Sequence, residues 1–318
     1  MKRDIAILTD IHGLLEPLEA ILEDTKKRGI TEVYSLGDNI GLGPNPREVM
    51  DLLMDNGVKC IAGNYEEYIN LGTEPFRYLD STRIADVDWT KRKLSPRHIE
   101  FLKVMPKFYE IIVGNKKIAL CHFANDVRID FGSRSTWSYQ SSRGDNSQFA
   151  YTNSEMQKKE VIELAKRAGE FYNGYRSYQN APLFDGKTVD YYDEIIQGHV
   201  HFKMLSEDSV YKIKRSIFKR MVEEKNTRFR TIRAAGMAYG SDSKDLASYI
   251  IVHIDGNDYT VEEVLVEYNR DKMIRSVNTS DDPCDKMKGF IRWLNWLKKS
   301  SIGSNLSLVK RIKRVIKF

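Results

Sequence analysis

The stretch "DIAILTDIHG", residues 4–13, decides the fold of this chain. An apolar run over residues 5–8 is followed by Asp10 and His12, two positions apart, and then by Gly13. The apolar run predicts a buried β-strand. Because side chains alternate along an extended chain, Asp10 and His12 are expected to point to the same side, and Gly13 lets the backbone turn into a helix. The stretch therefore predicts a buried strand that delivers a carboxylate and an imidazole at its carboxyl end.

Further alternating segments follow in the first third of the chain. Strand-like runs at residues 33–36 and 58–61 are separated by helical patterns at residues 16–27 and 46–55. This order predicts a parallel sheet covered by helices. Each strand is followed by polar residues, in the loops "TDIHG", "GDNIG" and "AGNYEE". Because sites in such sheets lie outside the carboxyl ends of the strands, we expect the three loops to converge.

The remainder of the chain is less regular. Residues 81–105 read as helical, with a new helix beginning at Ser95-Pro96, and hairpins are expected around Gly114-Asn115 and Gly256-Asn257. Residues 123–190, rich in Ser, Arg, Asn and aromatics, suggest an inserted cap. The expected organisation is a domain over residues 1–270 that contains this insertion, followed by a helical, basic extension over residues 271–318.

Composition narrows the class of protein. The 318 residues are 41% hydrophobic and 30% charged, as in globular proteins, and no apolar run approaches the roughly 20 residues of a membrane helix. A cytoplasmic protein is expected. The three cysteines, Cys60, Cys121 and Cys284, lack the spacing of a disulfide framework or a thiolate zinc site. The net charge is +5, and five Lys and Arg residues near the C-terminus account for all of it, so the rest of the chain is close to neutral. A nuclease would be expected to have a basic groove across its core, and this distribution of charge disfavours one.

The strand-end loops together supply a set of metal-binding side chains. Carboxylate and amide oxygens mixed with imidazole nitrogens suit manganese, iron or zinc and fit calcium poorly. Four of the six histidines belong to the set, whereas His98 and His253 lie in a helical stretch and a hairpin strand and are expected to be structural. The candidate ligands are Asp10, His12, Asp38, Asn64, His122, His199 and His201.

The order of these motifs resembles a known family. "TDIHG", "LGDN", "AGNYE", "LCHF" and "QGHVH" together are similar to the calcineurin-like metallophosphoesterase superfamily, from residue 4 to about residue 267. The stretch "GDNIGLGPNPREV" further resembles a bacterial branch of phosphodiesterases and phosphatases related to YfcE. The resemblance implies a two-layer sandwich of mixed β-sheets flanked by helices, where the strand patterns alone indicate only an α/β protein.

The resemblance also implies a ligand set. A first metal ion would be held by Asp10, His12 and His201, a second by Asn64, His122 and His199, and Asp38 would bridge both ions with its two carboxylate oxygens. The implied reaction is hydrolysis of a phosphomonoester or phosphodiester by a hydroxide that bridges the two metals. The alternative is a scaffold or regulatory binding protein with the same fold and little activity, which is disfavoured because every ligand position holds a competent side chain.

Tyr65 departs from the family pattern. Many members place a histidine after the asparagine, where it acts as general acid, and this chain has a tyrosine there. Its phenol, with an ordinary pKa near 10, stays protonated at neutral pH and would be a candidate acid. The alternatives are that a metal-bound water supplies the proton, that the substrate's leaving group needs little help, or that Tyr65 only forms the pocket wall.

Two regions carry open alternatives about partners. The insertion brings Arg128, Arg134 and Arg143 near several aromatics, which would suit a nucleotide-like or phosphopeptide substrate, although an ordinary subdomain is favoured. Residues 305–318 are amphipathic and basic. Docking on the protein's own surface is favoured over contact with a membrane surface or a partner. No oligomeric state is predicted.

Overall fold

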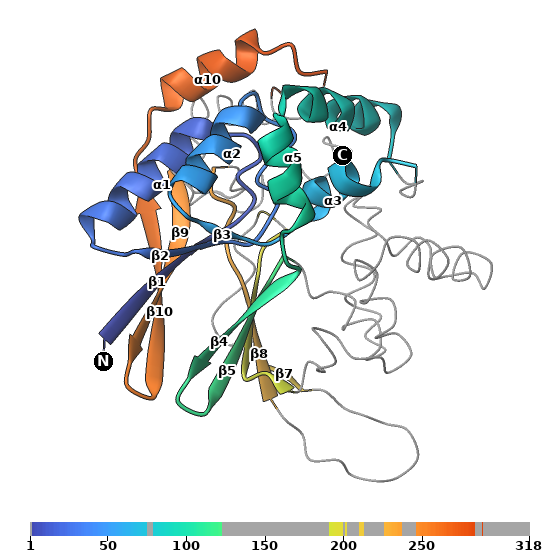
Figure 1. Cartoon of the computed structure of the whole chain (residues 1–318). Helices are drawn as coiled ribbons and strands as arrows, with labels where there is room; N and C mark the ends of the chain where they lie inside the picture. Colours follow the sequence, from blue (N-terminus) through green and yellow to red (C-terminus); the bar gives the residue numbers. More distant parts are fainter. Residues whose placement is uncertain are drawn as a thin grey trace, which may run out of the picture.

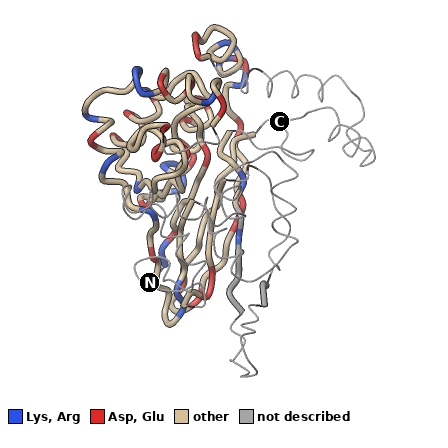
Figure 2. The backbone as a smooth tube through the Cα atoms, turned by 90° about the vertical axis from the view of Figure 1, so that its right-hand side faces the viewer, with Lys and Arg blue, Asp and Glu red and all other residues tan. Residues whose placement is uncertain are grey.

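The computed structural model describes residues 2–74, 79–122, 191–199, 201, 210–212, 226–236, 246–283 and 288. Within this part the chain is a mixed α/β structure with two five-stranded sheets and six helices. Figure 1 shows the two sheets and the helices, and Figure 2, turned by 90°, shows the helices gathered at one end with long strands running away from them.

The first sheet contains the strands predicted from the start of the chain. β1 pairs in parallel with β2 and β2 in parallel with β3, while β9 runs antiparallel to both β1 and β10. The predicted parallel arrangement of the first three strands is confirmed, and the pairing with β9 makes the sheet mixed. In spatial order the strands are β10 (Asp258–Val266), β9 (Ala247–Asp255), β1 (Lys2–Leu8), β2 (Glu32–Ser35) and β3 (Lys59–Cys60).

The second sheet is also mixed. β5 and β8 both pair in parallel with β6, and the edge strands β4 and β7 run antiparallel to their neighbours. The two predicted hairpins have turns at Gly114 and at Gly256-Asn257. These turns lie close together, as shown by the contact that a Cβ at Gly114 would make with Asn257. The spatial order is β4 (Phe108–Val113), β5 (Lys116–Cys121), β6 (Glu194–Gln197), β8 (Asn226–Thr231) and β7 (Val210–Lys212).

The apolar run of β1 separates two hydrophobic cores. Ile5 and Ile7 are fully buried in the cluster formed with the second sheet, whereas Ala6 and Leu8 are fully buried in the cluster formed with the helices. This alternation follows from the two-residue period of a strand. The two-layer sandwich of mixed sheets flanked by helices is thus confirmed in the part of the chain that the structure describes.

Six helices are described; α1 packs on β9 and β10 of the first sheet, and α3 packs on α4 and α5 (Figure 1). Ser95 caps α5, its hydroxyl accepting the N–H of His98, and Pro96 is the first helical residue, as predicted. The helix bounds are α1 (Leu15–Lys27), α2 (Pro46–Asp55), α3 (Asn64–Leu71), α4 (Ser81–Lys93), α5 (Pro96–Lys103) and α10 (Arg270–Thr279).

The description of "AGNYEE" as a polar loop is wrong. Residues Asn64–Leu71 form α3, and Asn64 and Tyr65 are its first two residues. Glu66, in the first turn, accepts the backbone N–H of Gly63 at 2.8 Å. The glutamate three residues after Gly63 is therefore a helix-start signal in this sequence.

The start of the predicted C-terminal extension packs on the domain. Met273 and Val277 of α10 are buried in the helix-side core, and Ser276 exchanges hydrogen bonds with Asn45. α10 therefore contributes to the helix-side core of the domain.

Several predictions lie outside the described residues. They concern the insertion at residues 123–190 with its arginines, the tail at residues 305–318, and Cys284. Cys60 and Cys121 are buried, and burial raises the pKa of Cys60. Among the described helices, none is long and apolar enough to cross a membrane.

His253 lies on β9 between two carboxylates and is expected to make stability depend on pH. Its Nδ1 faces Asp4 at 2.9 Å and its Nε2 faces Glu262 at 2.9 Å, and these hydrogen bonds raise its pKa above the ordinary value. A raised folded-state pKa gives stability that is present at pH 5.5 and is lost as the pH rises through that pKa. Because the site is partly exposed, we expect less than about 1 kcal/mol.

The measurement compares the wild type with His253→Gln by urea unfolding at pH 5.5 and pH 9. The difference in unfolding free energy should be present at pH 5.5 and should vanish at pH 9. A difference of the same size at both values would show that protonation of His253 contributes nothing.

Candidate active site

Loops that follow four strands meet at one place. The N–H of Asp10, after β1, donates to the carbonyl of Gly37 at 3.0 Å, and the N–H of His12 donates to that of Asp38 at 2.9 Å. In the second sheet, the N–H of Gly198 donates to the carbonyl of His122 at 2.9 Å. These bonds join the loops after β1 and β2 and those after β5 and β6.

The backbone of this region is held in a conformation that residues with a side chain rarely adopt. Five of the seven candidate ligands have positive φ angles in the left-handed region, with values between 49° and 72°. Such conformations cost free energy and persist only where the surroundings impose them, which they do most often at functional sites. The five are Asp10, His12, Asp38, His199 and His201.

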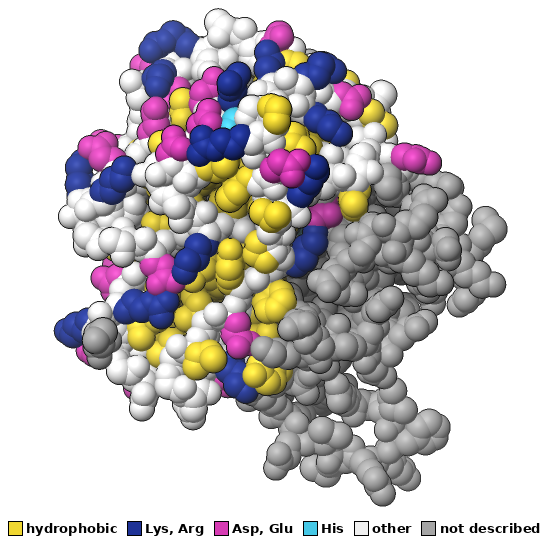
Figure 3. All heavy atoms as spheres, viewed as in Figure 1, with side chains coloured by type: hydrophobic (Ala, Val, Ile, Leu, Met, Phe, Trp, Pro, Cys, Tyr) yellow, Lys and Arg dark blue, Asp and Glu magenta, His cyan; other side chains and the backbone are white. Residues whose placement is uncertain are grey.

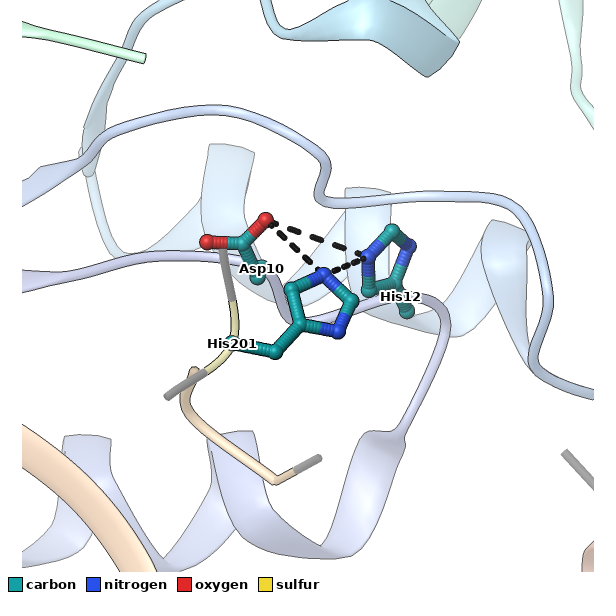
Figure 4. Close-up of side chains that lie close together, drawn as sticks. All are labelled: Asp10, His12 and His201. Atoms are coloured by element: carbon teal, nitrogen blue, oxygen red, sulfur yellow. Dashed lines mark hydrogen bonds and ion pairs between the residues drawn. The ribbon is translucent and has the colours of Figure 1, made fainter. Parts of the chain in front are cut away.

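Asp10, His12 and His201 form a first group (Figure 4). The two Nε2 atoms of His12 and His201 lie 3.0 Å apart, and Asp10 Oδ1 lies 3.3 Å from His201 Nε2 and 3.9 Å from His12 Nε2. Asp10 Oδ1 is buried and accepts no hydrogen bond from the described residues. A buried oxygen and two imidazole nitrogens that face one another fit a metal ion, which would satisfy all three.

Asp38, His122 and His199 form a second group. His122 Nε2 lies 3.1 Å from His199 Nδ1 and 3.6 Å from Asp38 Oδ2. Because His122 Nδ1 lies 2.8 Å from the carbonyl oxygen of Leu36, which can only accept, its proton is on Nδ1 and Nε2 presents a lone pair. The Asn64 amide nitrogen lies 3.1 Å from His199 Nδ1, so a half-turn of the amide would place its oxygen in this group.

One oxygen of Asp38 connects the two groups. Oδ2 lies 3.8 Å from His12 Nε2 and 3.6 Å from His122 Nε2, whereas Oδ1 accepts the N–H of Tyr65 at 2.9 Å. The two oxygens of Asp38 therefore have different surroundings in this structure, and their shared use by two ions stays a prediction. Asp38 would contact both ions, and the N–H of Tyr65 at the amino end of α3 orients its carboxylate.

Burial sets the protonation of these side chains. Burial lowers the pKa of His12 well below its ordinary value, helped by His201, and lowers the pKa of His122 to about 4. Burial, reinforced by the charge of Asp10, raises the pKa of Asp38 to about 6. Both histidines are consequently neutral near pH 7, which is the form that binds metal ions.

Glu66 holds the loops around Asp38 together through hydrogen bonds. The sequence analysis does not include it among the candidate site residues. It is fully buried, and its Oε2 accepts the N–H groups of Asp38 and Gly63 at 3.0 and 2.8 Å. Its Oε1 accepts the backbone N–H and the side-chain amide of Asn39 at 2.9 and 3.0 Å. One carboxylate thus ties the loop after β2 to the start of α3, which places Asp38 beside Asn64.

Gly198 allows His199 to approach Asp10. A Cβ at this position would overlap Thr9 Oγ1 and Asp10 Oδ2. With glycine there, the N–H of His199 donates to Asp10 Oδ2 at 2.8 Å, and the hydroxyl of Thr9 donates to the same oxygen. Gly198 therefore allows the loop that carries His199 to lie directly against Asp10.

Tyr65 is placed beside the first group, and its hydroxyl points to a buried carboxylate. The ring meets His12 edge to face at 5.6 Å, only 1% of the residue is exposed, and the hydroxyl donates to Asp86 Oδ2 at 2.6 Å. Because this proton is directed at Asp86, the geometry favours Tyr65 as part of the wall over Tyr65 as general acid.

Comparison with known proteins identifies the family. The family model described as calcineurin-like phosphoesterase matches residues 3–203. The chain belongs to this family. As a calcineurin-like phosphoesterase, it is of a family that typically binds divalent metals, and its two His and Asp groups could hold such ions.

The chain is also similar to individual proteins, of which the structure from Pyrococcus horikoshii shows a similar fold. An uncharacterized protein of Methanocaldococcus jannaschii is 35% identical over 122 residues, which are 38% of this chain and half the length of that relative. The crystal structure of a hypothetical protein from Pyrococcus horikoshii aligns with a TM-score of 0.54 at 16% identity, covering 90% of this chain and 97% of the other. The E. coli phosphoesterase YfcE aligns with a TM-score of 0.36 at 14% identity, covering 83% of this chain and all of YfcE.

Proposed function

We propose that this calcineurin-like phosphoesterase hydrolyses a phosphomonoester or phosphodiester with the help of two metal ions. The observation that carries the proposal is the position of Asp38 Oδ2 between the first and second groups, within 4 Å of an imidazole nitrogen of each. Two adjacent groups of ligands with one carboxylate between them fit a two-metal centre.

Each ligand has a distinct task in this proposal. Asp10, His12 and His201 would hold one ion, Asn64, His122 and His199 the other, and Asp38 would bind both. When bound, the two ions would activate a water molecule and withdraw negative charge from the phosphate group. The hydrogen bond from His122 to Leu36 fixes the ring so that Nε2 faces the site, and the fully buried Asp10 is kept from bulk water. Manganese, iron and zinc all suit this set of ligands.

The proposed substrate is a small phosphate ester and not a nucleic acid. On the face shown in Figure 3, Lys and Arg side chains alternate with Asp and Glu over the described helices. A nucleic-acid surface would show a continuous basic stripe, and the described residues on this face form none. We further propose a cytoplasmic location, and a peripheral role for residues 305–318 on the protein's own surface or on a membrane.

The experiment that tests the function is a substrate panel assayed with added manganese. The panel contains phosphomonoesters, cyclic nucleotides, dinucleoside polyphosphates and phosphopeptides. We expect hydrolysis of at least one class, its loss after treatment with a chelator, and its return when manganese is restored. A protein that binds manganese and hydrolyses none of these compounds would favour the alternative, a scaffold with the same fold.

A further inference from the structure

Asp86 is a fully buried carboxylate outside the set of candidate ligands. It lies on α4, and its Oδ2 accepts the hydroxyl of Tyr65 at 2.6 Å. Both of its oxygens lie 3.3 Å from the backbone nitrogen of Leu42, in the loop after β2. Burial of a carboxylate costs free energy unless hydrogen-bond donors surround it. Asp86 therefore joins α4 to the start of α3 and to the loop after β2.

The loop that Asp86 holds is strained. Leu42 has a φ of 65°, in the left-handed region that residues with a side chain rarely adopt. Gly41, beside it, has no room for a side chain, because a Cβ there would overlap the Tyr65 ring. The ring consequently packs directly on the backbone of this loop. Such a conformation persists only where its surroundings impose it, and Asp86 supplies one of the contacts that do so.

The ring of Tyr65 carries this constraint to the first group. It meets His12 edge to face, with the ring centroids 5.6 Å apart. The hydroxyl is held by Asp86, and the peptide N–H donates to Asp38 Oδ1 at 2.9 Å. A buried ring that is held at both ends has little freedom to tilt, so it restricts the positions open to the His12 imidazole.

We propose that Asp86 is a positioning residue for the first group and acts on His12 through the Tyr65 ring. Asp86 fixes Tyr65, and Tyr65 keeps the imidazole in the orientation that faces Asp10 and His201. Groups that fix the orientation of a metal ligand raise the affinity for the metal ion. The proposal rests on the proposed function, of which it uses the metal centre alone.

The test is the affinity for manganese of metal-depleted Tyr65→Phe, Asp86→Asn and the double variant. Tyr65→Phe keeps the ring and removes only the hydroxyl. We expect the dissociation constant of one of the two ions to rise about 3-fold to 10-fold. This is less than the roughly 10-fold to 100-fold typical when a hydrogen bond to a metal ligand is lost, because Tyr65 touches His12 by packing. Since both changes act on one hydrogen bond, the double variant should bind manganese no more weakly than Asp86→Asn alone.

Tyr249→Phe is the matched control. Tyr249 is also fully buried, and its hydroxyl donates to Asp24 Oδ2 at the same distance of 2.6 Å. That bond joins β9 to α1 and involves no candidate ligand. Each tyrosine variant loses one hydrogen bond and should have a lower melting temperature, but Tyr249→Phe should keep the manganese affinity of the wild type.

Three results would overturn the proposal and leave Asp86 as a residue that only stabilises the fold. The first is wild-type manganese affinity in Tyr65→Phe. The second is an equal loss of affinity in Tyr65→Phe and Tyr249→Phe, which would reflect stability alone. The third is a loss in the double variant equal to the sum of the two single losses, expressed as free energies, because Asp86 would then act independently of the Tyr65 hydroxyl.

Phosphoesterase activity is measured on the same proteins, so this proposal and the proposed function can fail separately. Wild-type protein that binds manganese and hydrolyses no phosphate ester, with weaker binding in both single variants, would support the role of Asp86 and sink the phosphoesterase proposal. An active wild type with unchanged manganese affinity in both variants would support the phosphoesterase and overturn the role of Asp86. Wild-type protein without affinity for manganese would overturn the role of Asp86 together with the metal centre.

Discussion

Asp38→Asn is expected to lower phosphoesterase turnover by more than about 100-fold, beyond the 10-fold to 100-fold typical of residues that only support a metal ligand. Asparagine keeps the shape of the side chain and can still accept the N–H of Tyr65 with its oxygen. The amide nitrogen would then stand in the place of Oδ2, which faces His12 at 3.8 Å and His122 at 3.6 Å. Because an amide N–H₂ group does not bind metal ions, the link between the two groups would be lost.

The measurement is steady-state turnover together with the metal content of purified protein. Asp55→Asn is the control, since Asp55 is exposed and pairs only with Arg97 in the described part of the chain. The control should keep both activity and metal. Wild-type turnover in Asp38→Asn would mean that the site lies elsewhere.

Glu66→Gln is expected to have the second large effect: it should lower both the free energy of unfolding and the affinity of the site for metal ions. Each oxygen of Glu66 accepts two N–H donors. In either orientation of a glutamine amide, its N–H₂ group would face two buried donors and leave them unsatisfied. We expect a loss of roughly 2–4 kcal/mol in the free energy of unfolding.

Because the same bonds hold the loop of Asp38, metal affinity should fall with stability. Thermal unfolding and manganese titration of the variant measure the two effects. Glu100→Gln serves as the control, because Glu100 is exposed and pairs with Lys103 on the same helix. A Glu66 variant as stable as the control, with wild-type affinity for manganese, would refute the fastening role.

Local sequence patterns were sufficient for much of the fold. The apolar run before Asp10 predicted β1, its two-residue period is the reason that Ile7 and Leu8 enter different cores, and Ser95-Pro96 marked the start of α5. The convergence of strand-end loops follows from parallel strands alone. The mixed sandwich needed the family resemblance, because β9 returns to pair with β1 from about 250 residues later in the chain.

Details of the site depended on contacts that no local pattern contains. The hydroxyl of Tyr65 finds Asp86 on another helix, and Glu66 reaches back to Asp38 and Asn39 across 27 or 28 residues. The orientation of the Asp38 carboxylate depends on the N–H of Tyr65 at the amino end of α3, a helix that the polar residues of "AGNYEE" do not indicate by themselves.

The central claim is that two metal ions share Asp38. The most direct measurement starts from metal-depleted protein, to which manganese is added in steps. At each addition, calorimetry or elemental analysis gives the number of ions bound per chain, and phosphoesterase activity is recorded. The account predicts two ions per chain in the wild type and activity that becomes complete only when both are bound. Wild-type protein that binds no manganese, zinc or iron, or that is fully active with a single ion, would contradict it.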